Sequence, residues 1–198
     1  MKKILVMSLL LGSCLTYAQK LKNETGNFSN LKGEASVNVK FNYSNLKLLK
    51  ENYKEDEYVS RRMKELNEKD NGNGDAWHSK WKNAKDGIWE PKFLELLLKN
   101  VDKVSFKEDD KSAKYTLLVD VVWIYPGWDV YMMKQAAKVT TNIKLVETKN
   151  QSNILYQVDA IDAPGDQFGN NYSNEARIGE GFAKTAKTIG KKIAKEIK

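Results

Sequence analysis

The chain of 198 residues is poor in the residue types that most often carry catalysis, metal binding and disulfide bonds. It has one cysteine, Cys14, and one histidine, His78. A histidine-based metal centre or a Ser/His/Asp triad needs further partners at matched positions, and neither an HExxH nor a GxSxG motif is present. We therefore expect no catalytic residue, metal site or cofactor, and we interpret His78 as a helix-surface residue.

Long apolar runs are also missing, apart from one at the start of the chain. Lys2 and Lys3 precede an apolar stretch over residues 4–11, and small residues follow it, which is the layout of a bacterial secretory signal. This stretch is too short to span a bilayer, which takes about 20 residues. No later segment is long and apolar enough either, so we expect an exported protein of the periplasm or cell envelope without a transmembrane helix.

Two ways of processing this signal compete. Residues 11–14, with the sequence LGSC, place small residues before Cys14, where a lipoprotein signal peptidase would cut and the cysteine would carry acyl chains. Residues 16–18, with the sequence TYA, instead favour a cut after Ala18 that leaves Gln19 as the new N-terminus. We favour the second cut, because the apolar stretch resumes at Leu15 and the polar chain starts only at Gln19.

The mature chain has the size and patterning of one α+β domain. We divide the sequence into a signal peptide over 1–18, a flexible leader over 19–32 that lacks periodicity, and a single domain over 33–198. Alternating or continuous apolar patterns predict four strands, over 35–43, 115–125, 138–146 and 154–161. Helical spacing predicts helices over 55–69, from 75, from 91 and from 174 to the C-terminus. The expected fold is a four-stranded, mainly antiparallel sheet with helices on one face and a long C-terminal helix.

Aromatic and methionine side chains gather at one predicted connection between strands, after the turn signal Pro126-Gly127. Such side chains offer large, adaptable apolar area to a partner, although they could equally fold back and pack on a helix. The candidate partner surface consists of Trp128, Tyr131, Met132 and Met133.

Positive charge is concentrated at the end of the chain. Residues 182–198 carry six lysines and one glutamate, whereas the whole chain has a formal net charge of +7. Five of the lysines recur every three or four residues opposite the apolar stripe, and they could contact an anionic membrane or form a solvated face: Lys184, Lys187, Lys191, Lys195 and Lys198. No aromatic residue interleaves them, so a nucleic-acid partner is not expected.

Several short motifs together resemble those of a group of uncharacterised secreted proteins of Gram-negative bacteria. They are the strand end Phe41-Asn-Tyr43-Ser44, Trp81, Pro91-x-Phe93, Ala113-x-Tyr115, Pro126-Gly127 and the helix segment over 177–184 with the sequence RIGEGFAK. The resemblance implies export and an α+β fold but no activity. At the level of fold, the order of elements also looks like the small domains of periplasmic and outer-membrane assembly lipoproteins.

These observations favour a non-enzymatic binding or assembly module of the cell envelope, whose partner would be an envelope protein. Peripheral association with anionic membrane through the lysines is the alternative. A third hypothesis is a hydrolase of an envelope polymer that uses carboxylates such as Asp120 or Glu180 as acid and base. It requires two carboxylates that face each other across a cleft.

Overall fold

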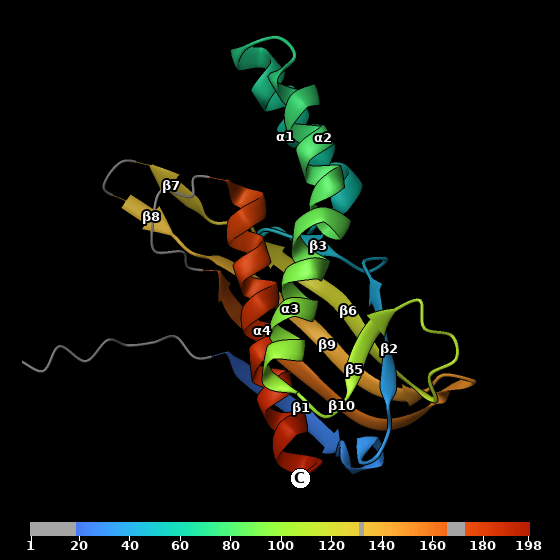
Figure 1. The fold of residues 1–198 in the computed structure, drawn as a ribbon. Helices are drawn as coiled ribbons and strands as arrows, with labels where there is room; N and C mark the ends of the chain where they lie inside the picture. Colours follow the sequence, from blue (N-terminus) through green and yellow to red (C-terminus); the bar gives the residue numbers. More distant parts are fainter. Residues whose placement is uncertain (1–18, 131–132, 166–172) are drawn as a thin grey trace, which may run out of the picture.

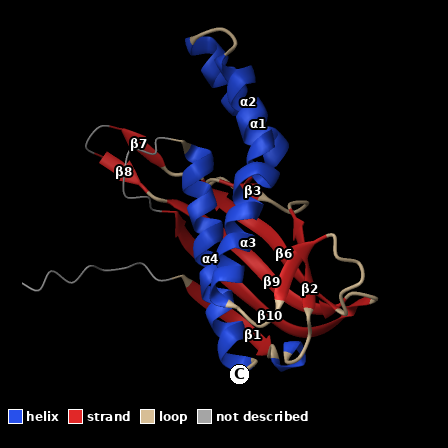
Figure 2. Ribbon diagram, in the orientation of Figure 1, coloured by secondary structure: helices blue, strands red, loops and turns tan. Residues whose placement is uncertain are grey.

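The computed structural model describes residues 19–130, 133–165 and 173–198, and it has an α+β architecture. Helices α3 and α4 lie side by side on one face of the main sheet, and α1 and α2 form a hairpin that projects beyond it (Figures 1 and 2). We call this hairpin the arm. In chain order the elements are β1 (Lys20–Gly26), η1 (Ser29–Leu31), β2 (Ser36–Asn42), β3 (Lys47–Leu48), β4 (Tyr53–Lys54), α1 (Glu55–Lys69), α2 (Asn73–Ala84), η2 (Lys85–Trp89), α3 (Glu90–Asn100), β5 (Ser105–Glu108), β6 (Tyr115–Tyr125), β7 (Trp128–Val130), β8 (Met133–Gln135), β9 (Ala137–Glu147), β10 (Asn150–Gly165) and α4 (Asn174–Glu196).

The main sheet is larger than expected and mixed in direction. It has eight strands in the order β1-β10-β9-β6-β2-β5, with β3 paired to β6 and β4. The prediction of a four-stranded, mainly antiparallel sheet is therefore wrong, although all four expected strands are present. Strand β2 runs parallel to both β5 and β6, because the helical connection between β2 and β5 crosses one face of the sheet and returns the chain in the same direction.

Residues 19–32 are built into the fold and do not form the flexible leader that we predicted. Strand β1 pairs antiparallel with β10, and the following segment buries the side chains of Phe28 and Leu31 completely. The pairing shifts register between Lys22 and Thr25, and Asn23 has a positive φ of 52°. This irregularity interrupts the alternation of side chains, so the usual signature of a strand is absent from the sequence.

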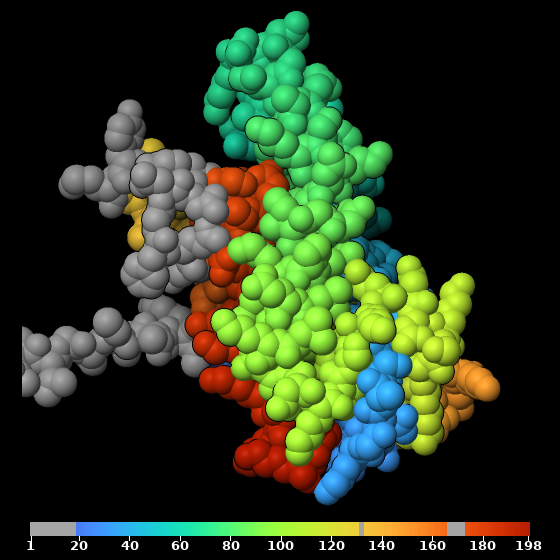
Figure 3. All heavy atoms as spheres, in the orientation of Figure 1, coloured from blue at the N-terminus to red at the C-terminus, as the bar shows by residue number. Residues whose placement is uncertain are grey.

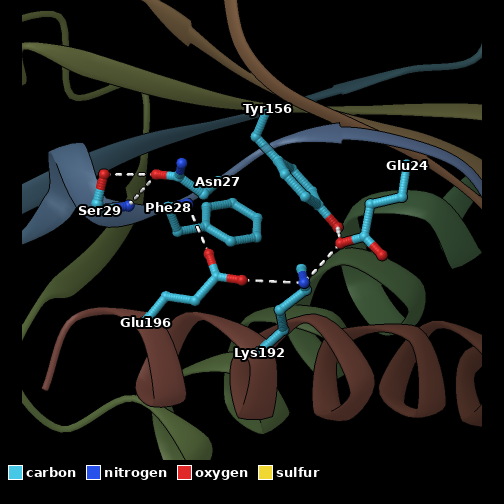
Figure 4. Close-up of polar contacts among 7 residues, drawn as sticks. All are labelled: Glu24, Asn27, Phe28, Ser29, Tyr156, Lys192 and Glu196. Carbon is cyan, nitrogen blue, oxygen red and sulfur yellow. Dashed lines mark hydrogen bonds and ion pairs between the residues drawn. The ribbon is translucent and has the colours of Figure 1, made fainter.

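A polar clasp ties β1 to the C-terminal helix (Figure 4). Lys192 lies 2.5 Å from Glu24 and 2.9 Å from Glu196. Glu196 in turn accepts a hydrogen bond from the backbone N–H of Phe28 at 2.7 Å, and the hydroxyl of Tyr156 donates to Glu24 at 3.1 Å. The hydrogen bond with Glu24 raises the pKa of Lys192 and lowers that of Glu24. The first strand and the last helix of the domain thus stabilise each other.

Helices α2 and α3 form one continuous rod, where the sequence predicted two separate helices. The π-helical turn η2 joins them, and Pro91 follows at the start of α3. Proline has no N–H to donate and its ring crowds the carbonyl four residues earlier, so a widened turn just before it lets the helix continue. None of the helices within the described ranges is long and apolar enough to cross a membrane.

Aromatic rings connect the arm to the body of the domain. The ring of Trp81 in α2 lies 5.2 Å, edge to face, from that of Trp89 in η2, and Trp89 stacks on Phe182 of α4 at 5.7 Å. All three side chains are essentially fully buried. We call this series of rings the aromatic column; it fixes the angle at which the arm leaves the sheet, because close-packed rings resist sliding.

Two carboxylates meet where α3 passes the edge strand β5. Glu90 interacts with Glu108 and with the hydroxyl of Tyr43, and burial together with the negative charge of Glu108 raises the pKa of Glu90 to about 7. The same burial raises the pKa of Tyr43 far above its usual value. Glu90 and Glu108 repel each other only when both carboxyl groups are ionised.

The first prediction tests whether residues 19–32 are structural. Phe28→Ala should lower the free energy of unfolding by about 3–5 kcal/mol, because the ring is buried and packs 4.0 Å from that of Tyr156. Urea denaturation followed by circular dichroism measures this. Lys22→Ala, at an exposed position of β1, is the control and should change the stability by no more than about 0.5 kcal/mol. Equal stabilities of the two variants would mean that residues 19–32 are a flexible leader after all.

The second prediction concerns the pH dependence of stability. Between pH 4.5, the ordinary pKa, and about 7, folded Glu90 holds a proton that the unfolded chain has lost, so raising the pH through this window destabilises the folded state. The wild type should lose about 1–2 kcal/mol relative to Glu90→Gln between about pH 5 and pH 8, since solvent screens a half-buried group. Urea denaturation at both pH values checks this, and a difference between the two proteins that does not change with pH would contradict it.

Candidate functional site

A cleft opens at the end of the domain where α4 begins. The arm forms one wall, β7 and the residues before it form the other, and the first turn of α4 forms the floor. Figure 3 shows the arm rising next to the start of α4. The cleft has a volume of about 740 Å³, a size that suits a small ligand or a short peptide. Its lining includes Tyr58, Arg62, Trp77 and Lys80 from the arm, the segment 126–130, and Ser173, Asn174, Glu175 and Arg177.

Two charged residues are buried in the floor of the cleft. Glu175 and Arg177 are each only 6% exposed. Ser173 caps α4 by accepting a hydrogen bond from the backbone N–H of Ala176 at 3.3 Å, and its hydroxyl donates to Glu175 Oε2 at 2.6 Å. The positive end of the helix dipole stabilises the carboxylate of Glu175 at this position.

Arg177 is held by its neighbours in the same turn and by the opposite wall. Its guanidinium donates to the side-chain oxygen of Asn174. Burial lowers the pKa of Arg177, and the negative charges of Asp129 in β7 and of Glu175 oppose that shift. The floor and the β7 wall are therefore coupled by charge.

The arm contributes an aromatic wall that continues the aromatic column. The ring of Trp77 lies 5.5 Å from that of Trp81 and 5.9 Å from that of Tyr58. Burial raises the pKa of Tyr58 to about 12, so its hydroxyl stays protonated at neutral pH and can act as a hydrogen-bond donor. Trp89 donates its indole N–H to the backbone oxygen of Glu175 at 2.8 Å, which anchors the floor to the column.

Strands β7 and β8 continue the hairpin formed by β6 and β9. The pairing runs without a shift of register from Tyr125 opposite Lys138 to Trp128 opposite Gln135. The chain bends away from the main sheet at Gly127, whose φ is +69° and where any Cβ would meet the backbone oxygen of Gln135. The hairpin therefore projects as a separate two-stranded ribbon (Figure 1).

This β7–β8 ribbon carries much of the exposed apolar surface. Because side chains alternate along strands, Trp128, Val130 and Met133 share one face, and they are 41%, 51% and 65% exposed. Only two other large apolar side chains in the described ranges are comparably exposed, Leu98 and Ile154. Of the candidate partner surface predicted from the sequence, Trp128 and Met133 are thus exposed, while Tyr131 and Met132 lie outside the described residues.

Four of the five lysines predicted to form one face of the last helix lie on α4, and Lys198 follows just after its end. All five are exposed, and none of them takes part in an ion pair within the described part of the chain: Lys184, Lys187, Lys191, Lys195 and Lys198. We call this set the lysine stripe. The sixth lysine, Lys192, points to β1 and joins the polar clasp.

Cys14 and the signal segment lie outside the described residues. The first described residue, Gln19, donates to Thr185 Oγ1 at 2.9 Å, so the described chain enters the fold beside α4.

Asp120 and Glu180, named for the hydrolase hypothesis, do not come together. Asp120 lies on β6, where Asn42 and Lys144 bond to its two oxygens across the sheet face opposite the helices. Glu180 lies on α4 and pairs with Lys92 of α3. The interacting pair of Glu90 and Glu108 is absent from the linings of both large clefts.

A second cleft, of about 970 Å³, lies on another side of the arm and includes His78 in its lining. Its central charges satisfy one another. Glu55 accepts hydrogen bonds from the indole N–H of Trp81 at 3.0 Å and from Lys85 at 2.7 Å, and Lys85 also sits 4.6 Å from the ring centre of Tyr43.

The sequence did not identify Trp77, Glu175 or Arg177 as members of a site. An acid in the first turn of a helix is ordinary, and Trp77 fits the apolar spacing of α2. Their proximity depends on the arm, which brings residues about a hundred positions apart to the same cleft, so no local pattern signals it.

No protein family model matches this chain, and no curated protein sequence matches it. Among solved structures it is similar to the PelC dodecamer from Paraburkholderia phytofirmans, with 10% identity and a TM-score of 0.39 over 85% of this chain and 95% of that chain. A point variant of the same PelC dodecamer gives 10% identity and a TM-score of 0.37, over 85% and 98% of the two chains. Values this low assign neither a family nor a function.

Proposed function

We propose that this protein is an exported, non-enzymatic binding or assembly module of the periplasm or cell envelope. The observation that carries the proposal is the β7–β8 ribbon, whose exposed apolar face projects from the domain. Exposed apolar side chains gathered on one projecting element are typical of surfaces that bind a protein partner. The secretory layout of residues 1–18 supports export, and it predicts a mature chain that begins at Gln19.

The ribbon suits a partner surface for a mechanical reason as well. A two-stranded ribbon has little stability by itself, but here it continues the pairing of two long strands of the main sheet. The pairing thereby holds the partner-facing side chains in a defined register, although they remain exposed. The opposite face of the ribbon carries Asp129, whose negative charge acts on Arg177 at the start of α4.

Site-specific crosslinking tests this surface. With p-benzoylphenylalanine in place of Met133, irradiation of cells of the native host should give a discrete adduct with an envelope protein, and Trp128→Ala should weaken it several-fold. The matched control carries the photoreactive residue at Ile154, which is apolar and 46% exposed in β10. Without an adduct, or with the same adducts from both positions, the ribbon is not the partner surface. The intact mass of the recovered protein shows whether it begins at Gln19 or at an acylated Cys14.

The second candidate function is peripheral association with an anionic membrane. It is favoured by the lysine stripe, which extends about 17 Å along α4 from Lys184 to Lys195 with no acidic partner among the described residues. A lipid on Cys14 would add a second, hydrophobic anchor to such an electrostatic contact. Each lysine near an anionic surface contributes about 1 kcal/mol to binding.

Vesicle binding tests the lysine stripe. Replacing Lys187, Lys191 and Lys195 by Gln should weaken binding to phosphatidylglycerol vesicles at low salt by about a hundredfold. Sedimentation with vesicles measures this, and added salt should weaken the wild type in the same direction. Three lysines of the arm, Lys64, Lys69 and Lys82, replaced by Gln, form the control with the same change of net charge. Equal binding of the two triple variants would mean that vesicle binding depends only on the net charge of the protein and not on the lysine stripe.

A further inference from the structure

The cleft beside the ribbon holds a buried hydrogen-bond acceptor and a buried donor that nothing in the described chain satisfies. Glu175 is more than nine-tenths buried, yet its Oε1 atom has no hydrogen-bond partner among the described residues. The indole Nε1 of Trp77, on the facing wall, has none either. Both residues line the cleft. Buried polar atoms are nearly always paired, so these two mark places where a ligand or an ordered water belongs.

The wall opposite Trp77 presents a strand edge that no other described strand occupies. Strand β7 pairs only with β8, and no backbone hydrogen bond within the described ranges uses its other edge. Strand β7 continues β6, whose neighbour at this end of the sheet is β3, and the arm begins just after β3 and β4. Residues 126–130 accordingly line the cleft, with Leu49, which follows β3, beside them. A free edge offers N–H and C=O groups to an added strand.

An extended peptide satisfies both walls at once. The main-chain groups of a strand point alternately to its two sides, so one side can pair with β7 while the other meets the arm and the floor. On that second side, an N–H can donate to Glu175 Oε1 and a carbonyl can accept from the indole N–H of Trp77. The lining carries three cationic side chains against two acidic ones, and this excess of one positive charge favours an acidic peptide: Arg62, Lys80 and Arg177 against Asp129 and Glu175.

A sugar fits the same cleft less well. Binding of sugars by stacking needs an exposed aromatic face, but the ring of Trp77 packs against those of Trp81 and Tyr58, and Tyr58 is buried. The indole N–H of Trp77 has no partner among the described residues, and this favours a ligand with a carbonyl acceptor.

We propose that the cleft between the arm and β7 binds an extended, acidic peptide segment of a partner protein, added as a strand to the free edge of β7 and held on its other side by Glu175 and Trp77. This inference rests on the proposed function as a binding module. It uses the backbone edge of β7 together with Glu175 and Trp77, whereas the crosslinking test uses the side chain at Met133, which does not line the cleft. A partner could therefore contact the ribbon without placing a peptide in the cleft.

The test uses a phage-displayed library of random linear peptides selected against the mature protein. Acidic sequences should be enriched, and a selected peptide should bind Trp77→Phe and Glu175→Gln about three- to tenfold more weakly, since the first change removes the N–H donor and the second replaces the carboxylate acceptor by a weaker, neutral amide. Fluorescence anisotropy measures the affinities. Glu95→Gln, an exposed carboxylate of α3, is the matched control and should leave the affinity unchanged. Methylation of individual peptide N–H groups should abolish binding at alternate positions, as strand pairing requires.

Several outcomes would overturn the proposal. They are a selection that yields no binding peptide, enrichment of basic sequences, or affinities that are the same for all variants, which would leave the two buried atoms to ordered water. Trp77→Phe keeps an aromatic ring at this position and removes the N–H, so this variant remains informative if Glu175→Gln fails to fold. A failure here together with a specific crosslink from Met133 would reject only the peptide site, whereas failure of both would also reject the proposed binding function.

Discussion

The contact between Trp89 and Phe182 is the one on which the arrangement of the other parts depends. Trp89 lies in the π-helical turn between the arm and α3, and Phe182 lies in the middle of the helix that covers the sheet. Through Trp81 the same series of rings reaches the base of the arm, and through the indole N–H of Trp89 it reaches the backbone of Glu175. The packing of these rings therefore sets the direction of the arm, the depth of the cleft and the position of its floor together, because closely packed rings resist rearrangement.

The π-helical turn is what allows that contact. An α-helical rod through Pro91 would be kinked, since proline removes a hydrogen bond and its ring crowds the preceding turn. The widened turn absorbs this within the helix, and it rotates the residues before Pro91 relative to those after it. Trp89 can then face α4 while Trp77 and Trp81 face α1, so one helix serves two different neighbours.

The two projecting hairpins, the arm and the β7–β8 ribbon, are stabilised by different interactions. The arm is stabilised by the aromatic packing at its base and by pairs of opposite charge along α1, such as Arg61 with Glu57 and Arg62 with Glu65. The β7–β8 ribbon is stabilised by register, because its pairing continues that of β6 and β9. Each extends surface beyond the sheet without a core of its own, and the polar clasp at the opposite end closes the domain between β1 and α4.

Local patterns in the sequence determined the elements that a single periodicity can specify. The helix predicted over 55–69 is α1 to the residue, and the strand predicted over 115–125 is β6. The lysine stripe was also readable, because a helix with an apolar stripe places its remaining positions in solvent. Only the tertiary structure decided the rest. The irregular β1 and the short β5 are strands because β10 and β2 offer them partners, and pairing between distant segments leaves no local signature. Likewise, Glu175 and Trp77 look ordinary in the sequence and share a cleft only because the aromatic column holds the arm above the start of α4.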